Sequence, residues 1–158
     1  MLTGKKIVLG VSGGIAAYKM ANVASMLSKL HADIHVVMTE NATHFITPET
    51  FEVLTGNHCY TDTFDRCMEL HVPHIALGTQ ADAILIAPAS ADVVGKIANG
   101  IADDMLTTCV LPATCPVMLA PSMNVHMYEN PIVQDNMKKL ASYGYEIIEA
   151  DEGYLACR

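Results

Sequence analysis

The segment that most restricts the fold is residues 83–87 (AILIA), a run without a polar side chain. Successive side chains of a strand point to opposite faces of its sheet, so this run would be buried on both faces. Strands of that kind occur in parallel sheets that helices cover on each side. Residues 83–87 therefore predict an α/β fold with a central parallel sheet.

Four further apolar runs have the length of strands: residues 6–11 (KIVLGV), 34–38 (IHVVM), 117–120 (VMLA) and 146–149 (EIIE). Helical patterns lie between them, at Val23, Met26, Leu27 and Leu30, at residues 47–54 before Gly56, at 105–110, and at 131–143 before Gly144. This alternation predicts a three-layer, doubly wound, Rossmann-like parallel sheet. We expect a single domain, residues 1–158, because no repeat or linker interrupts the pattern.

Composition narrows the classes of function. The formal net charge is −8 and the nine Lys and Arg residues form no cluster, which argues against a nucleic-acid partner. No apolar stretch approaches the roughly 20 residues of a membrane helix, and the first residues (MLTGKK) do not form a signal peptide. We therefore expect a cytoplasmic protein without a membrane segment. Only 16% of the residues are charged, which suggests that copies of the chain or a ligand cover part of its surface.

The cysteines and histidines do not form a recognisable metal or disulfide pattern. The five cysteines are odd in number and no two form a C-x-x-C pair, and there is no H-E-x-x-H motif. We expect no metal site, and small core or surface thiols at Cys59, Cys67, Cys109 and Cys115.

The turn after the first strand is rich in glycine. Ligands of doubly wound sheets bind beyond the carboxyl ends of the strands, and the first run ends there in Ser12-Gly13-Gly14. Glycines permit a tight turn, and a helix start offers free N–H groups to a phosphate. The turn matches neither G-x-G-x-x-G nor a P-loop, so it suits a mononucleotide better than a dinucleotide. A plain glycine-rich turn remains the alternative.

Two later strand ends also carry small or polar residues. Residues 83–87 lead into 88–92 (PASAD), whose small side chains would let a flat ring system approach the backbone. Helix capping by Ser90 or Asp92 is the alternative. Asn124 follows residues 117–120 and offers a donor and an acceptor to a carboxylate or amide, with an ordinary N-cap as its alternative. Capping also explains Asp103 and Asp104 more simply than acid–base catalysis does.

Several segments match a known family in order along nearly the whole chain: 12–19 (SGGIAAYK), 74–75 (HI), 81–82 (AD), 87–91 (APASA), 95–104 (GKIANGIADD), 121–127 (PSMNVHM) and 153–157 (GYLAC). Together they resemble the homo-oligomeric flavin-containing cysteine decarboxylases. The P-x-M-N-x-x-M segment, His-Ile and the terminal Ala-Cys are the specific features. Ser122 stands where the family usually has alanine, and Arg158 where glycine commonly follows the cysteine.

The resemblance implies a cofactor, FMN, and roles for individual residues. Its phosphate would be held by Ser12, Gly13 and Gly14, with Thr39 as a further contact and Ser90 and Ala91 beside the isoalloxazine ring. His74 matches the active-site histidine of the family. Asn124, with its neighbour Met123, matches the substrate-binding segment. Cys157 matches the cysteine that supplies a proton in the last step.

The implied reaction converts 4′-phosphopantothenoyl-L-cysteine to 4′-phosphopantetheine, a step of coenzyme A biosynthesis. Oxidation of the substrate thiol to a thioaldehyde creates an acceptor for the electrons that CO₂ leaves behind, and the resulting enethiol is then reduced. The alternatives are a peptidyl-cysteine decarboxylase that stops at the enethiol, and a non-catalytic regulatory flavoprotein. The joint presence of His74, Asn124 and Cys157 favours the first activity.

The resemblance also bears on assembly. It implies a homo-trimer, with a dodecamer as the larger assembly. In bifunctional relatives a synthetase domain would follow Arg158.

Overall fold

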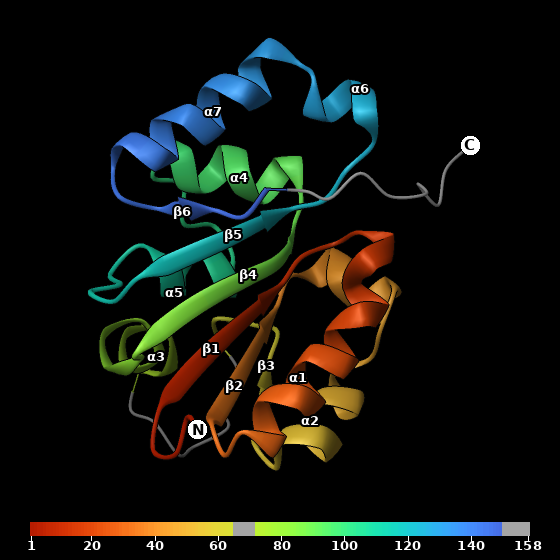
Figure 1. Cartoon of the computed structure of the whole chain (residues 1–158), viewed down its shortest axis with the longest axis vertical. Coiled ribbons are helices and arrows are strands. Elements are labelled where there is room, and N and C mark those ends of the chain that lie inside the picture. Colours follow the sequence, from red (N-terminus) through yellow and green to blue (C-terminus); the bar gives the residue numbers. More distant parts are fainter. Residues whose placement is uncertain (65–71, 150–158) are drawn as a thin grey trace.

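The computed structural model describes residues 1–64 and 72–149. They form a six-stranded parallel sheet in the order β3-β2-β1-β4-β5-β6, with helices on both faces (Figure 1). The chain begins in the middle of the sheet, builds outward to β3, and then crosses to β4 to build the other half. The predicted doubly wound α/β fold is therefore confirmed.

The strands are β1 (Lys6–Val11), β2 (Asp33–Met38), β3 (Cys59–Tyr60), β4 (Ala83–Ala89), β5 (Val117–Pro121) and β6 (Glu146–Ile147). The α-helices are α1 (Met20–Lys29), α2 (Pro48–Thr55), α3 (Pro73–Gln80), α4 (Ala91–Ala98), α5 (Met105–Val110), α6 (Val125–Tyr128) and α7 (Pro131–Ser142). Two 3₁₀ helices, η1 (Ile15–Lys19) and η2 (Glu40–His44), follow β1 and β2.

The sheet separates two apolar cores. On one side, Leu9 and Val11 of β1 and Val36 of β2 pack with Phe51 of α2 and Ala24 of α1. On the other side, residues of β4 and β5 pack with α3, α4, α5 and α7. Figure 1 shows α1 and α2 beside the β1–β3 half, and α4 and α7 beside β5 and β6. The predicted burial of β4 is confirmed, since Ile84 and Ile86 lie in the second core and Leu85 packs against the first.

Some local predictions need correction. The fifth strand was expected over residues 146–149 but ends at Ile147, although Ile148 still donates to the Leu119 carbonyl at 2.8 Å. Neither β3 nor α3 was predicted. The apolar face of α1 also differs, because Met26 is 57% exposed whereas Ala24 is buried. Small side chains such as Ala24 let this helix lie close to the sheet.

The capping predictions are confirmed in two places. Gly56 ends α2 with a left-handed φ of 75°. Asp104 is the N-cap of α5 and accepts the Thr107 N–H at 2.7 Å. Asp103 instead pairs with Lys96 at 3.3 Å, so it links the segment after α4 back to that helix.

The crossing of α3 and α5 is unusually close. Gly78 of α3 faces the backbone of α5, and a Cβ atom on Gly78 would collide with the carbonyl oxygen of Cys109. Only a glycine permits this approach.

Among the described helices, none is long and apolar enough to cross a membrane.

Candidate functional site

Ser12 links the carboxyl ends of β1 and β4. Its hydroxyl donates to the Pro88 carbonyl at 2.5 Å and accepts the Ser90 N–H at 2.8 Å. The Ser12 N–H also donates to the Pro88 carbonyl, at 3.3 Å. The side chain is fully buried, at 0% exposure. Two turns that are 76 residues apart in the chain are thus held in a fixed relation.

Gly13 and Gly14 bring further chain segments to the same edge. A Cβ atom on Gly13 would lie 2.5 Å from Cβ of Asn41, so this turn packs against the start of η2. A Cβ atom on Gly14 would lie 3.9 Å from Cγ of Pro88 and 4.0 Å from the Ser122 carbonyl oxygen. Within the described residues, no acceptor meets the N–H group of Gly13 or of Gly14. The turn therefore offers two unused backbone donors.

Thr39 stands at the end of β2, next to this turn. Its N–H donates to the Val11 carbonyl at 3.0 Å, which ties β2 to the end of β1. Its hydroxyl oxygen accepts the Ala42 N–H at 3.2 Å and so caps η2. The hydroxyl hydrogen of this nearly buried residue has no acceptor in the described part of the chain.

Ser90 is the N-cap of α4, which confirms that capping by Ser90, and not by Asp92, starts this helix. The Ser90 hydroxyl oxygen accepts the Val93 N–H at 3.3 Å. Asp92 forms an ion pair with Lys96 at 3.1 Å instead. The hydroxyl hydrogen of Ser90 has no acceptor within the described ranges, and Ala91 follows as the first residue of the helix.

The end of β5 completes the edge. The Ser122 N–H donates to the Ala89 carbonyl at 3.0 Å, which joins the segment containing Met123 and Asn124 to the end of β4. Asn124 is exposed and caps α6, since its Oδ1 accepts the His126 N–H at 2.9 Å. That bond fixes the orientation of the amide. The Nδ2 group has no acceptor among residues 1–64 and 72–149 and is free to donate.

Of the two predicted catalytic residues, the structure describes only His74. His74 lies in the first turn of α3, and no hydrogen bond links it to Ser12, Ser90 or Asn124 there. Its Nδ1 is buried and lacks a partner, and it is the one side-chain nitrogen or oxygen of the described residues with that property. Cys157 lies outside the described residues, as do Cys67 and His71.

Three thiols of the described chain, two of them buried and that of Cys115 half-buried, have raised pKa values. Burial, reinforced by the carboxylates of Glu52 and Glu49, raises the pKa of Cys59 to about 12. Burial and Asp104 raise the pKa of Cys109 to about 12. Burial also raises the pKa of Cys115. The thiolate is the nucleophilic form, so these three thiols are poor nucleophiles at neutral pH. No cluster of three or more potential metal ligands occurs within the described ranges.

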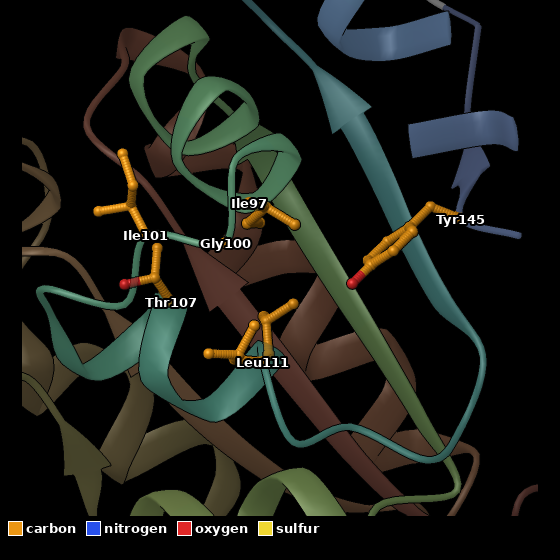
Figure 2. Close-up of a pocket in the computed structure, with 7 residues that line it drawn as sticks. Ile97, Gly100, Ile101, Thr107, Leu111 and Tyr145 are labelled. Carbon is orange, nitrogen blue, oxygen red and sulfur yellow. The ribbon is translucent and has the colours of Figure 1, made fainter. Parts of the chain in front are cut away.

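Two cavities lie elsewhere. Figure 2 shows one between α4, α5 and the start of β6, lined by Ile97, Ile101, Thr107 and Tyr145 among others. Its volume of about 10 Å³ holds at most about one water molecule. A larger cavity of about 210 Å³ lies at the amino end of β5, beside Cys115 and Val117. The predicted site residues follow the carboxyl ends of the strands, at the opposite edge of the sheet. Neither cavity is lined by any of the predicted site residues that the structure describes.

Neither Asn41 nor the Pro88 carbonyl was predicted to belong to the site. The first packs against Gly13 and the second receives two bonds from Ser12. Asn41 lies in a polar segment without a motif, and a backbone carbonyl leaves no mark in a sequence.

The chain is similar to proteins of defined families. The family model described as Flavoprotein matches residues 1–158. The coenzyme A biosynthesis bifunctional protein CoaBC of Bacillus subtilis is 50% identical over 157 residues, which are 99% of this chain and 39% of that protein. The probable phosphopantothenoylcysteine decarboxylase of Streptococcus mutans is 44% identical over 155 residues, covering 97% of this chain and 87% of that protein. The chain thus spans about two fifths of the bifunctional relatives and most of the shorter one.

Two solved structures share the fold. The FMN-dependent cysteine decarboxylase SpaF has a TM-score of 0.90 and 38% identity, covering 97% of this chain and 88% of that chain. A cysteine-to-serine mutant of PPC decarboxylase, complexed with pantothenoylaminoethenethiol, has a TM-score of 0.84 and 30% identity, covering 96% of this chain and 85% of that chain.

Proposed function

The chain belongs to the flavoprotein family, and from that premise we propose that it is an FMN-dependent decarboxylase of 4′-phosphopantothenoyl-L-cysteine, with 4′-phosphopantetheine as its product. The observation that carries the proposal is the convergence of Gly13, Ser90 and Asn124 at one sheet edge, each with a donor unused by the fold. The similarity to a phosphopantothenoylcysteine decarboxylase along most of its length supports the substrate.

The donors at this edge suit a flavin mononucleotide. The N–H groups of Gly13 and Gly14 fit an anionic phosphate, since successive backbone N–H groups in a turn form an anion-binding concavity. The hydroxyl hydrogen of Thr39 is a further donor beside that turn. Ser90 and Ala91, at the start of α4, would adjoin the polar edge of the flavin ring. When bound, FMN supplies the oxidation of the substrate thiol and the later reduction of the enethiol.

The chain's own residues would then hold the substrate and move protons. The Nδ2 group of Asn124 would donate to the substrate carboxylate and hold it in place until CO₂ leaves, with Met123 beside it. Loss of CO₂ from the thioaldehyde leaves its electron pair in an enethiol. Cys157 would donate a proton to the enethiol carbon. His74 would act in the active site through its half-buried imidazole, whose buried Nδ1 is unpaired in the described chain.

Mass spectrometry of the product tests the proposal. The purified protein, loaded with FMN, is incubated with 4′-phosphopantothenoyl-L-cysteine. Loss of CO₂ alone is the expected result. Loss of CO₂ and two further hydrogens would instead indicate an enzyme that stops at the enethiol. An unchanged substrate in a flavin-loaded protein would favour a regulatory flavoprotein.

A variant of Cys157 tests the last step. We expect Cys157→Ser to bind FMN as the wild type does and to release or retain the enethiol, because serine is a much weaker acid than a thiol. The solved PPC decarboxylase mutant with bound pantothenoylaminoethenethiol carries a change of the same kind. If Cys157→Ser formed the saturated product at the wild-type rate, another group would be the proton donor.

We also propose that the chain assembles as a homo-trimer, with a dodecamer as the larger assembly. The apolar side chains of Ile15, Tyr18 and Phe45 are 54%, 59% and 47% exposed on η1 and just after η2, beside the proposed cofactor site. Such side chains suit an interface between subunits better than contact with water. Light scattering during size-exclusion chromatography should give three or twelve times the chain mass of 17.0 kDa. A mass of 17.0 kDa would contradict this assembly.

A further inference from the structure

The hydroxyl of Ser12 has its donor and one acceptor site already in use. A serine hydroxyl has one hydrogen to donate and two lone pairs to accept with. The hydrogen goes to the Pro88 carbonyl at 2.5 Å, and one lone pair receives the Ser90 N–H at 2.8 Å. The Ser12 backbone N–H is also directed to the Pro88 carbonyl, at 3.3 Å.

This arrangement has a consequence for anion binding. A phosphate dianion offers only acceptor oxygens, so a ligating hydroxyl must donate its hydrogen to it. The hydrogen of Ser12 is committed within the fold, and the side chain is 0% exposed. The neighbouring N–H groups of Gly13 and Gly14, by contrast, have no acceptor in the described chain.

We propose that Ser12 is a positioning residue whose hydroxyl sets the Gly13-Gly14 turn against the Ser90-Ala91 turn without itself contacting the cofactor. This inference rests on the proposed function, since it assigns the two turns to the phosphate and the ring of one flavin. The hydroxyl links two turns that contact different ends of that cofactor. Its removal therefore acts on the binding of the ring as well as of the phosphate.

The hydrogen bond from the Ser90 N–H to the Ser12 hydroxyl can be tested in the apoprotein. Amide hydrogen exchange at Ser90 is compared in the wild type and in Ser12→Ala by NMR. We expect Ser90 to lose about tenfold or more in protection, because the acceptor of its N–H is gone. The matched control is Ser28→Ala, which removes a hydroxyl that joins α1 to the Leu54 carbonyl at 3.2 Å, away from the strand ends. The control should leave exchange at Ser90 unchanged.

The positioning role of the Ser12 hydroxyl in flavin binding is tested with two flavins. Fluorescence titration measures the dissociation constants of FMN and riboflavin, which lacks the phosphate. We expect Ser12→Ala to weaken both by similar factors, roughly three- to tenfold each, and to shift the visible spectrum of bound flavin. Ser12→Cys, which retains a weak donor and acceptor, should give smaller changes and covers the case in which the alanine variant does not fold.

The outcomes separate the inference from the function on which it rests. A loss of FMN affinity with unchanged riboflavin affinity would overturn the inference and make Ser12 a phosphate ligand. Unchanged exchange at Ser90 in Ser12→Ala would overturn it as well. If the wild type bound neither flavin, the proposed function would fail together with the inference, whatever the Ser12 variants did.

Discussion

Asn124 and Asn130 have the same local geometry, but only Asn124 is proposed to bind the substrate. Each caps a helix with Oδ1, which accepts the N–H two residues ahead at 2.9 Å. Asn124→Asp keeps the cap but replaces the free NH₂ group by a carboxylate oxygen, which would repel the carboxylate of the substrate. We expect kcat/KM to fall by about a hundredfold or more, with little change in the free energy of unfolding.

The control for this prediction is Asn130→Asp, an equivalent change at the start of α7. Steady-state kinetics and urea unfolding are measured on both variants. Asn130→Asp should retain kcat/KM within about twofold, since surface substitutions have small effects. Equal losses in the two variants would mean that capping, and not substrate binding, explains the effect at position 124.

The thiols differ in reactivity. Cys59 and Cys109, with pKa values raised by burial to about 12, should resist alkylation by iodoacetamide at pH 8 in the folded protein. Both should react on unfolding in urea, when burial no longer raises the pKa. Peptide mass spectrometry after timed alkylation identifies the modified residues. Rapid modification of either thiol in the folded protein would contradict their burial.

At the scale of elements, sequence patterns predicted the strands that carry long apolar runs. β1 was predicted with its observed bounds, and β4 and β5 were found because their burial leaves a continuous apolar signal. β3 has two residues, too few for a period to be visible. α3 mixes Pro, Gly and polar residues and therefore shows no amphipathic pattern, although it positions His74.

The positions of Ser12, Ser90 and Asn124 after the strands could be predicted from the sequence, but the hydrogen bonds that join these segments could not. The strand ends directed attention to Ser12, Ser90 and Asn124, because a doubly wound sheet binds ligands there. The bond between Ser12 and Pro88 spans 76 residues, and no local pattern reports it. The capping roles of Ser90 and Asn124 were foreseen as alternatives to binding. The geometry allows both, since capping uses an acceptor and leaves a donor.

The α3–α5 crossing gives a prediction about packing. Gly78→Ala would place a methyl group against the Cys109 carbonyl and within 3.0 Å of Pro112, so the helices must separate. We expect a loss of about 1–3 kcal/mol in the free energy of unfolding, measured in urea. Gly95→Ala in α4 is the control, because its Cβ would meet nothing closer than Asn136 Nδ2 at 3.6 Å. That change should be neutral or stabilising; a neutral Gly78→Ala would show that the contact is not tight.

At the scale of the whole molecule, two carboxylates make the free energy of unfolding depend on pH. They belong to Asp82 and Asp33, at the amino ends of β4 and β2 and opposite the candidate site. Hydrogen bonds from the Lys5 ammonium at 2.9 Å and the Lys6 N–H at 2.8 Å hold the pKa of Asp82 below its ordinary value of 3.8. Burial raises the pKa of Asp33, but hydrogen bonds with Asn57 and His35 outweigh it and leave that pKa lowered too. Such groups stabilise the fold above the pKa of the unfolded chain, and the contribution is lost as pH falls through the lower folded pKa.

We therefore expect the free energy of unfolding in urea to decrease as the pH falls below about 4. Asp82→Asn removes the titrating group and should make this decrease shallower. Asp135→Asn, at an exposed position of α7 without a hydrogen bond or ion pair in the described chain, is the control and should keep the wild-type slope. The prediction is wrong if the two variants have the same slope.

The division of the interior into two cores has a consequence for synthesis on the ribosome. The buried members of the core under α1 and α2 all lie between Leu9 and Cys59, so they can assemble as soon as that length of chain has emerged. The other face of the same strands, which includes Val8 and Val37, is covered only after the later helices have been translated. During that interval a nascent chain presents a half-finished sheet with an unpaired β1 edge and an uncovered apolar face. This is the state in which we expect it to bind chaperones, and in which premature termination after β3 would yield an aggregating fragment.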